Sequence, residues 1–99
     1  MARVALAGGA QADLDRLFEF LVAGDANATP TVIDLVLDAL SILERHPVIG
    51  RPAERGLREL VISRGRSGYV ALYEYFEAED TVLVVALKHQ REAGYPEER

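Results

Sequence analysis

Residues 68–89, GYVALYEYFEAEDTVLVVALKH, decide the fold of this chain. They contain two runs rich in β-branched and aromatic residues, 69–76 and 81–89, which an acidic tetrapeptide separates. Two such runs joined by a short polar loop predict a β-hairpin. A third run, 57–63, comes before them across a turn that contains two glycines. The sequence therefore predicts three strands in an antiparallel meander.

The half of the chain before the meander predicts two amphipathic helices. The first is expected over 11–22, where apolar residues recur at helical spacing: Leu14, Leu17, Phe18 and Leu21. The second is expected from Pro30 to about Arg45, with Thr29 as its N-cap and proline at its first position. Its apolar stripe consists of Ile33, Val36, Leu37, Leu40 and Leu43.

A short strand, Arg3 to Leu6, is expected before the helices, paired at an edge of the sheet or against a meander strand. The predicted fold class is α+β, in the order β-α-α-β-β-β. Two helices pack on one face of a twisted, mainly antiparallel four-stranded sheet. Its strand 69–76 places Tyr69, Ala71, Tyr73 and Tyr75 on one face and Val70, Leu72, Glu74 and Phe76 on the other. We expect the helices to cover the second face and leave the tyrosine face open.

Composition limits the classes of function. A chain of 99 residues predicts a single domain over 1–99. It has no cysteine, and its two histidines are too far apart in sequence for a metal-ligand motif, so we expect neither metal nor cofactor. The N-terminus is too short for a signal peptide and no apolar run of membrane length follows it. We therefore expect a cytoplasmic protein with no membrane contact.

Charge is distributed unevenly along the chain. The net charge is −5, although a nucleic-acid-binding domain usually carries a basic face. Residues 1–50 carry three basic and seven acidic side chains, whereas 51–68 carry five arginines against two glutamates. The second segment is thus a basic patch on an acidic body. Its arginines suit either a solvated loop or contact with an anionic ligand, and we favour the second role for Arg58.

The end of the last predicted strand gathers groups that can bind a phosphate and transfer a proton. Lys88, His89, Arg91 and Tyr95 follow one another within eight residues. RNA can be cut without a metal when a base activates the 2′-hydroxyl, an acid protonates the leaving oxygen and cations stabilise the developing charge. An imidazole titrates near neutral pH, a guanidinium can clamp a phosphate through two hydrogen bonds, and a phenol can stack on a base.

Three sequence blocks, in this order, resemble the RelE/ParE superfamily of toxins from type II toxin–antitoxin modules, also known as plasmid stabilisation systems. They are HPVIGRP at 46–52, GLRELVI at 56–62 and GRSGYVALY at 65–73. The HPVIGRP turn and the HQREAGY end at 89–95 carry most of the resemblance. The resemblance covers the chain from about Asp13 to Tyr95. It implies the fold described above and growth inhibition as the function. It also implies a small antitoxin as the cognate partner.

For the members that cleave mRNA on the ribosome, the resemblance implies an arginine on the first meander strand, a basic group at the end of the last strand and a C-terminal aromatic residue. Here these are Arg58, His89 or Arg91, and Tyr95, which we take as candidate catalytic residues. Candidate substrate-binding residues are Arg66, Tyr69 and Lys88.

The molecular target stays open at this level. The leading hypothesis is a ribosome-associated mRNA endonuclease, because His89, Arg91, Tyr95 and Arg58 match its chemistry. The alternative is a ParE-type inhibitor that binds DNA gyrase without catalysis. Acidic balance, a single lysine and the HPVIGRP turn favour this alternative. A third reading is a toxin-like domain that only binds its partner.

Overall fold

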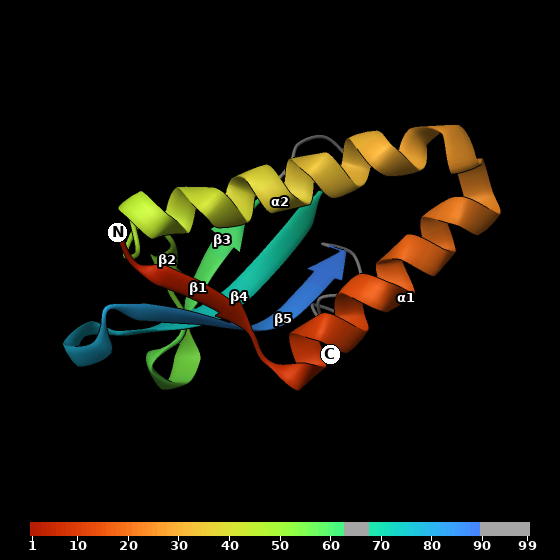
Figure 1. The fold of residues 1–99 in the computed structure, drawn as a ribbon. Helices are drawn as coiled ribbons and strands as arrows, with labels where there is room; N and C mark the ends of the chain where they lie inside the picture. Colours follow the sequence, from red (N-terminus) through yellow and green to blue (C-terminus); the bar gives the residue numbers. More distant parts are fainter. Residues whose placement is uncertain (63–67, 90–99) are drawn as a thin grey trace.

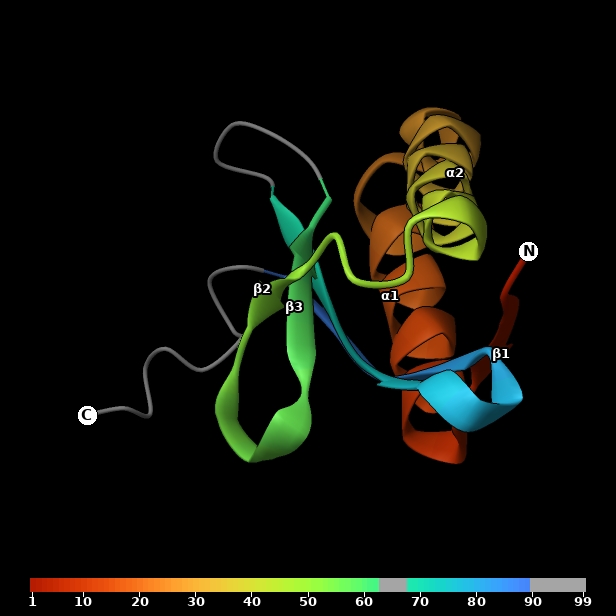
Figure 2. The same ribbon diagram turned by 90° about the vertical axis from the view of Figure 1, so that its left-hand side faces the viewer.

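The structure, a computed structural model, describes residues 1–62 and 68–89. In order, the chain forms β1 (Arg3–Leu6), α1 (Gly8–Asp25), a 3₁₀ turn (Ala26–Ala28), α2 (Thr29–Arg45), β2 (Arg51–Pro52), β3 (Arg58–Val61), β4 (Tyr69–Phe76) and β5 (Thr81–His89). The α+β prediction of two helices on one face of a sheet is confirmed (Figures 1 and 2).

The sheet has five strands in the order β1-β5-β4-β3-β2. The sequence predicted four strands. The additional strand is the two-residue β2, which lies in the segment expected to be a turn and pairs with β3. β1 runs parallel to β5, with Leu6 opposite Val84, and every other pair is antiparallel. The predicted bounds of β4 and β5 are confirmed, and β3 is shorter than predicted.

The first helix begins earlier than the sequence suggested. The helix was expected over 11–22, but Gly8 and Gly9 already lie in the first turn of α1. A side chain at Gly9 would bring its Cβ to 3.4 Å from the carbonyl oxygen of Val85, so this glycine suits the close approach of α1 to β5. Thr29 was expected to be the N-cap of α2. It already has helical backbone angles, and its hydroxyl donates to the Asp25 carbonyl oxygen instead.

The helices cover the tyrosine face of β4, so our assignment of the covered face was wrong. Tyr69, Ala71 and Tyr73 are buried in the core that the sheet forms with α1 and α2. The alternation along β4 was correct, but alternation alone does not tell which face the helices cover. Glu74 belongs to the opposite, half-exposed face, where a carboxylate remains in contact with water.

A β-bulge interrupts the regular alternation of faces along β5. Leu72 pairs with Ala86 and Tyr73 pairs with Val84, which leaves Val85 as an extra residue. The bulge brings Val82, Val84 and Leu87 onto the same buried face, although simple alternation places Leu87 opposite the two valines. It also leaves His89 opposite Tyr69 on the helix-covered face.

Candidate functional site

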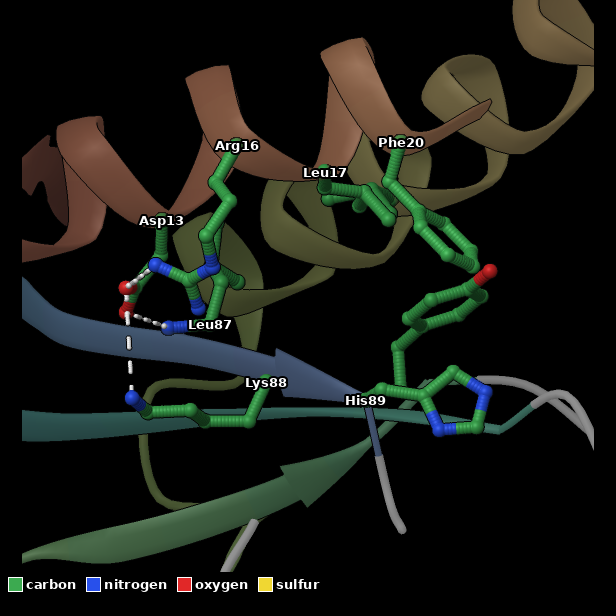
Figure 3. A pocket seen from close by; sticks show the side chains of 9 residues that line it. Asp13, Arg16, Leu17, Phe20, Leu87, Lys88 and His89 are labelled. Carbon is green, nitrogen blue, oxygen red and sulfur yellow. Dashed lines mark hydrogen bonds and ion pairs between the residues drawn. The ribbon is translucent and has the colours of Figure 1, made fainter. Parts of the chain in front are cut away.

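A pocket of about 390 Å³ lies between the helices and the end of β5. α1 supplies one wall, β4 and β5 supply the other, and α2 contributes one residue. The lining residues are Asp13, Arg16, Leu17, Phe20, Val36, Tyr69, Leu87, Lys88 and His89 (Figure 3). Three residues predicted from the sequence to form the site, Tyr69, Lys88 and His89, therefore come together here.

The pocket combines apolar walls with a charged rim. Leu17, Val36 and Leu87 belong to or pack against the core, whereas Phe20 of α1 is 68% exposed. The lining also includes the cations Arg16 and Lys88, which lie around Asp13 (Figure 3). Such a site suits a ligand that has an apolar anchor and acidic neighbours.

Asp13 joins α1 to the end of β5. Asp13 is buried, with 8% of the residue exposed. One carboxylate oxygen accepts a hydrogen bond from the backbone amide of Leu87 at 2.9 Å. The other oxygen lies 3.0 Å from an Arg16 guanidinium nitrogen and 3.9 Å from Lys88 Nζ (Figure 3). This carboxylate thus satisfies a buried backbone donor and sits between two cations, which offsets the cost of its burial.

Tyr69 and His89 meet at the outer end of the pocket. Their rings pack edge to face with centroids 5.2 Å apart and an interplanar angle of 85°. Burial raises the pKa of the Tyr69 phenol above its usual value of 10.0, because an apolar environment disfavours phenolate. At neutral pH, Tyr69 is therefore a packing partner of His89 and not a base.

Arg58 has a different neighbourhood. Its guanidinium donates to the carbonyl oxygen of Gly50 at 2.8 Å and to that of Val48 at 3.1 Å. The backbone amide of Gly50 in turn donates to the Tyr73 hydroxyl at 2.8 Å. A Cβ at Gly50 would lie 2.8 Å from the Tyr73 ring, so only glycine fits this approach. Arg58 and Tyr73 together fix the HPVIGRP turn against the sheet.

The structure does not bring Arg58 to the pocket. Arg58 lies opposite Tyr73 on β4, and His89 lies opposite Tyr69. Four residues of β4 separate these positions, which corresponds to about 13 Å at roughly 3.3 Å per residue. Glu59, the acidic neighbour of Arg58, forms an ion pair of 2.6 Å with Arg51. Arg66, Arg91 and Tyr95 lie outside the described residues.

Asp13, Arg16 and Phe20 line the pocket but were not among the site residues predicted from the sequence. In a helix over 11–22, Asp13 falls in the first turn, where the helix dipole alone accounts for a carboxylate. One signal was available, because Asp13 falls on the same helical stripe as Ala10, Leu14 and Leu17. A carboxylate within an apolar stripe needs a partner across the interface. Within residues 1–62 and 68–89, no group of three His, Cys, Asp or Glu side chains could hold a metal ion.

Comparison with known proteins now identifies the class. The chain resembles a chain of the solved structure of the chromosomal ParDE TA system from P. aeruginosa, with a TM-score of 0.75, 18% identity, and 90% and 96% of the two chains covered. It also resembles a chain of the intact E. coli RelBE toxin–antitoxin complex, with a TM-score of 0.63, 19% identity, and 90% and 96% coverage. These likenesses define a RelE/ParE-like fold.

The sequence comparisons establish the family. Residues 4–94 match the family described as ParE toxin of type II toxin-antitoxin system, parDE. The protein named Toxin RelE3 from Caulobacter vibrioides is 33% identical over 92 residues, which cover 93% of this chain and 98% of that protein. The chain therefore belongs to the ParE/RelE family of toxins from type II toxin–antitoxin systems. Among the described helices, none has the length and apolarity that crossing a bilayer requires.

Proposed function

We propose that this toxin inhibits growth in the cytoplasm as a ParE-type protein, by binding DNA gyrase without catalysing a reaction. The observation that carries this proposal is the position of Arg58. Its guanidinium donates to the carbonyl oxygens of Val48 and Gly50 and lies far along the sheet from His89. A phosphate clamp for RNA cleavage needs the guanidinium and the proton-transfer group at the same phosphate.

The groups beside His89 also favour binding over catalysis. General acid–base cleavage requires a second group that exchanges a proton near neutral pH. Tyr69 is the aromatic partner of His89, and burial moves the pKa of its phenol further above neutral pH, so it does not act as a base there. Lys88 directs its ammonium group toward Asp13 (Figure 3). In the described part of the chain, the pocket thus has the composition of a recognition surface.

A second candidate function is mRNA cleavage, which the position of His89 favours. His89 lines the pocket at the strand end that leads to Arg91 and Tyr95, and a relative of this chain carries the name Toxin RelE3. This route makes His89 a proton-transfer group. If the toxin cleaves mRNA, His89→Gln abolishes growth inhibition. If the toxin binds gyrase, His89→Gln only weakens inhibition, because it removes the binding contacts of the imidazole and no catalytic step.

We further propose that a cognate antitoxin covers the pocket. Solved structures with this fold include toxin–antitoxin complexes. The apolar walls and the exposed Phe20 provide an anchor point for a partner chain. Phe20→Ala should weaken capture of the co-expressed antitoxin. Phe18→Ala is the matched control, because Phe18 is an exposed residue of the same helix that does not line the pocket. Equal capture by the two variants contradicts this docking site.

The test of the target uses toxin separated from its antitoxin. Purified toxin is added to a gyrase supercoiling reaction and, at the same concentrations, to an in-vitro translation reaction with a defined mRNA. We expect loss of supercoiling and intact translation. Loss of translation with cut mRNA supports the second candidate function and contradicts the first. A folded toxin that inhibits neither reaction and does not slow growth contradicts both, and matches a domain that only binds its partner.

A further inference from the structure

The end of β5 has an unusual environment for a strand in the interior of a sheet. β1 pairs with β5 only as far as Val84, which lies opposite Leu6, whereas β5 continues to His89. From Val85 onward, β4 pairs with one side of β5, and no described strand pairs with the other. Backbone amides on an unpaired strand edge need other acceptors when they are buried.

Asp13 supplies that acceptor from α1. Its carboxylate binds the buried amide of Leu87 at 2.9 Å and lies 3.9 Å from the ammonium group of the next residue, Lys88. The following residue is His89, at the outer end of the pocket. One helical side chain therefore contacts two successive residues of the strand end, one through its backbone and one through its side chain (Figure 3).

We propose that Asp13 is a positioning residue that holds the Lys88–His89 end of β5 in the geometry required for toxicity. The remainder of β5 is held by β1 and β4, so loss of Asp13 should loosen the strand end and leave the fold intact. This proposal depends on the toxin function but not on the identity of the target. Asp13 acts through Leu87 and Lys88, and is not itself assigned a contact with the target.

Three variants isolate the role of the carboxylate. Asp13→Ala removes both the acceptor and the charge, and Asp13→Asn retains an acceptor oxygen for the Leu87 amide. Asp15→Ala is the matched control, because it removes an exposed carboxylate from the same turn of α1. A fourth variant, Val82→Ala, lowers global stability through a fully buried side chain near the start of β5, away from the pocket.

The first measurement is amide hydrogen exchange of the folded variants. We expect protection of the Leu87 amide to fall by about 10- to 100-fold in Asp13→Ala, the factor that corresponds to one hydrogen bond to a charged acceptor. Asp13→Asn should recover most of this protection, and Asp15→Ala should match the wild type. Unchanged protection of Leu87 in Asp13→Ala overturns the proposal.

The second measurement is growth inhibition at equal amounts of folded toxin. Asp13→Ala should need about tenfold more toxin than the wild type for the same inhibition, if strand-end opening limits activity. Asp13→Asn should restore inhibition, and Val82→Ala should keep it. Equal inhibition by Asp13→Ala and the wild type, or equal losses in Asp13→Ala and Val82→Ala, overturn the positioning role. If the wild-type chain does not slow growth, the proposed function is contradicted. This result is distinct from a failure of the positioning role, which only the comparison of the variants with the wild type reveals.

Discussion

Tyr73→Phe should destabilise the domain although it removes a single oxygen atom. The Tyr73 side chain is fully buried, at 0% exposure, and its hydroxyl accepts a hydrogen bond of 2.8 Å from the Gly50 amide. The substitution retains the ring and its packing but leaves a buried amide without its acceptor. An unsatisfied buried donor costs about 1–3 kcal/mol. For a domain of about 100 residues, 1 kcal/mol corresponds to roughly 4–8 °C, so Tm should fall by about 4–24 °C.

Thermal and urea unfolding followed by circular dichroism measure this effect. Tyr75→Phe is the matched control, because it makes the same change two residues later on the same face of β4. The Tyr75 hydroxyl donates to Asp80 at the exposed surface, so its removal should leave Tm close to that of the wild type. The urea dependence should be unchanged in both variants, since neither alters the surface exposed on unfolding. The reasoning is refuted if Tyr73→Phe has the same Tm as the wild type, or if Tyr75→Phe lowers Tm as much as Tyr73→Phe does.

Three further predictions concern the arginines and the tyrosines. Arg58→Ala should lower the unfolding free energy by about 1–2 kcal/mol, measured by urea titration, because it frees two carbonyl oxygens of the turn that are only partly shielded from water. Arg55→Asn should stabilise the domain by roughly 0.5–1 kcal/mol, since Arg55 has a φ of 61° in the β2–β3 turn and asparagine tolerates this left-handed conformation better; an unchanged or lower Tm contradicts this. The pKa of Tyr75 is raised, first by its hydrogen bond to Asp80, and burial raises the pKa of Tyr69, both from the usual 10.0. The folded state therefore retains protons that the unfolded chain releases, and unfolding titrations should show stability falling as pH rises above about 10, a decline that Tyr75→Phe should reduce.

The limits of the two long strands were predictable because their signals are local. Acidic residues 77–80 separate two apolar runs, and the structure places the β4–β5 connection there. The covered face was not predictable from the same pattern. It depends on the bulge at Val85 and on the Gly50 amide, which provides a donor for the buried Tyr73 hydroxyl. Both features arise from pairings between distant parts of the chain, which alternation within a strand does not contain.

The site shows the same division between local and distant information. Tyr69, Lys88 and His89 were predicted from their positions at strand ends, and the structure gathers them in one pocket. The partners of Arg58 could not be read from β3, since they lie in the turn at 48–50. Asp13 was missed because its backbone partner, Leu87, is 74 residues away in sequence. Contacts of this range are decided by how the helices pack on the sheet.

The most direct test of inhibition without catalysis is a map of RNA 5′ ends in cells that express the toxin. Cleavage by 2′-hydroxyl attack leaves a 5′-hydroxyl end at each cut, so ligation that is selective for these ends detects it. The control is cells without toxin, because Arg58→Ala weakens the fold and would make an ambiguous reference. We predict marked growth arrest and DNA damage with no new 5′-hydroxyl ends in mRNA. New ends within coding sequences, appearing before growth stops and absent with His89→Gln, would contradict the account.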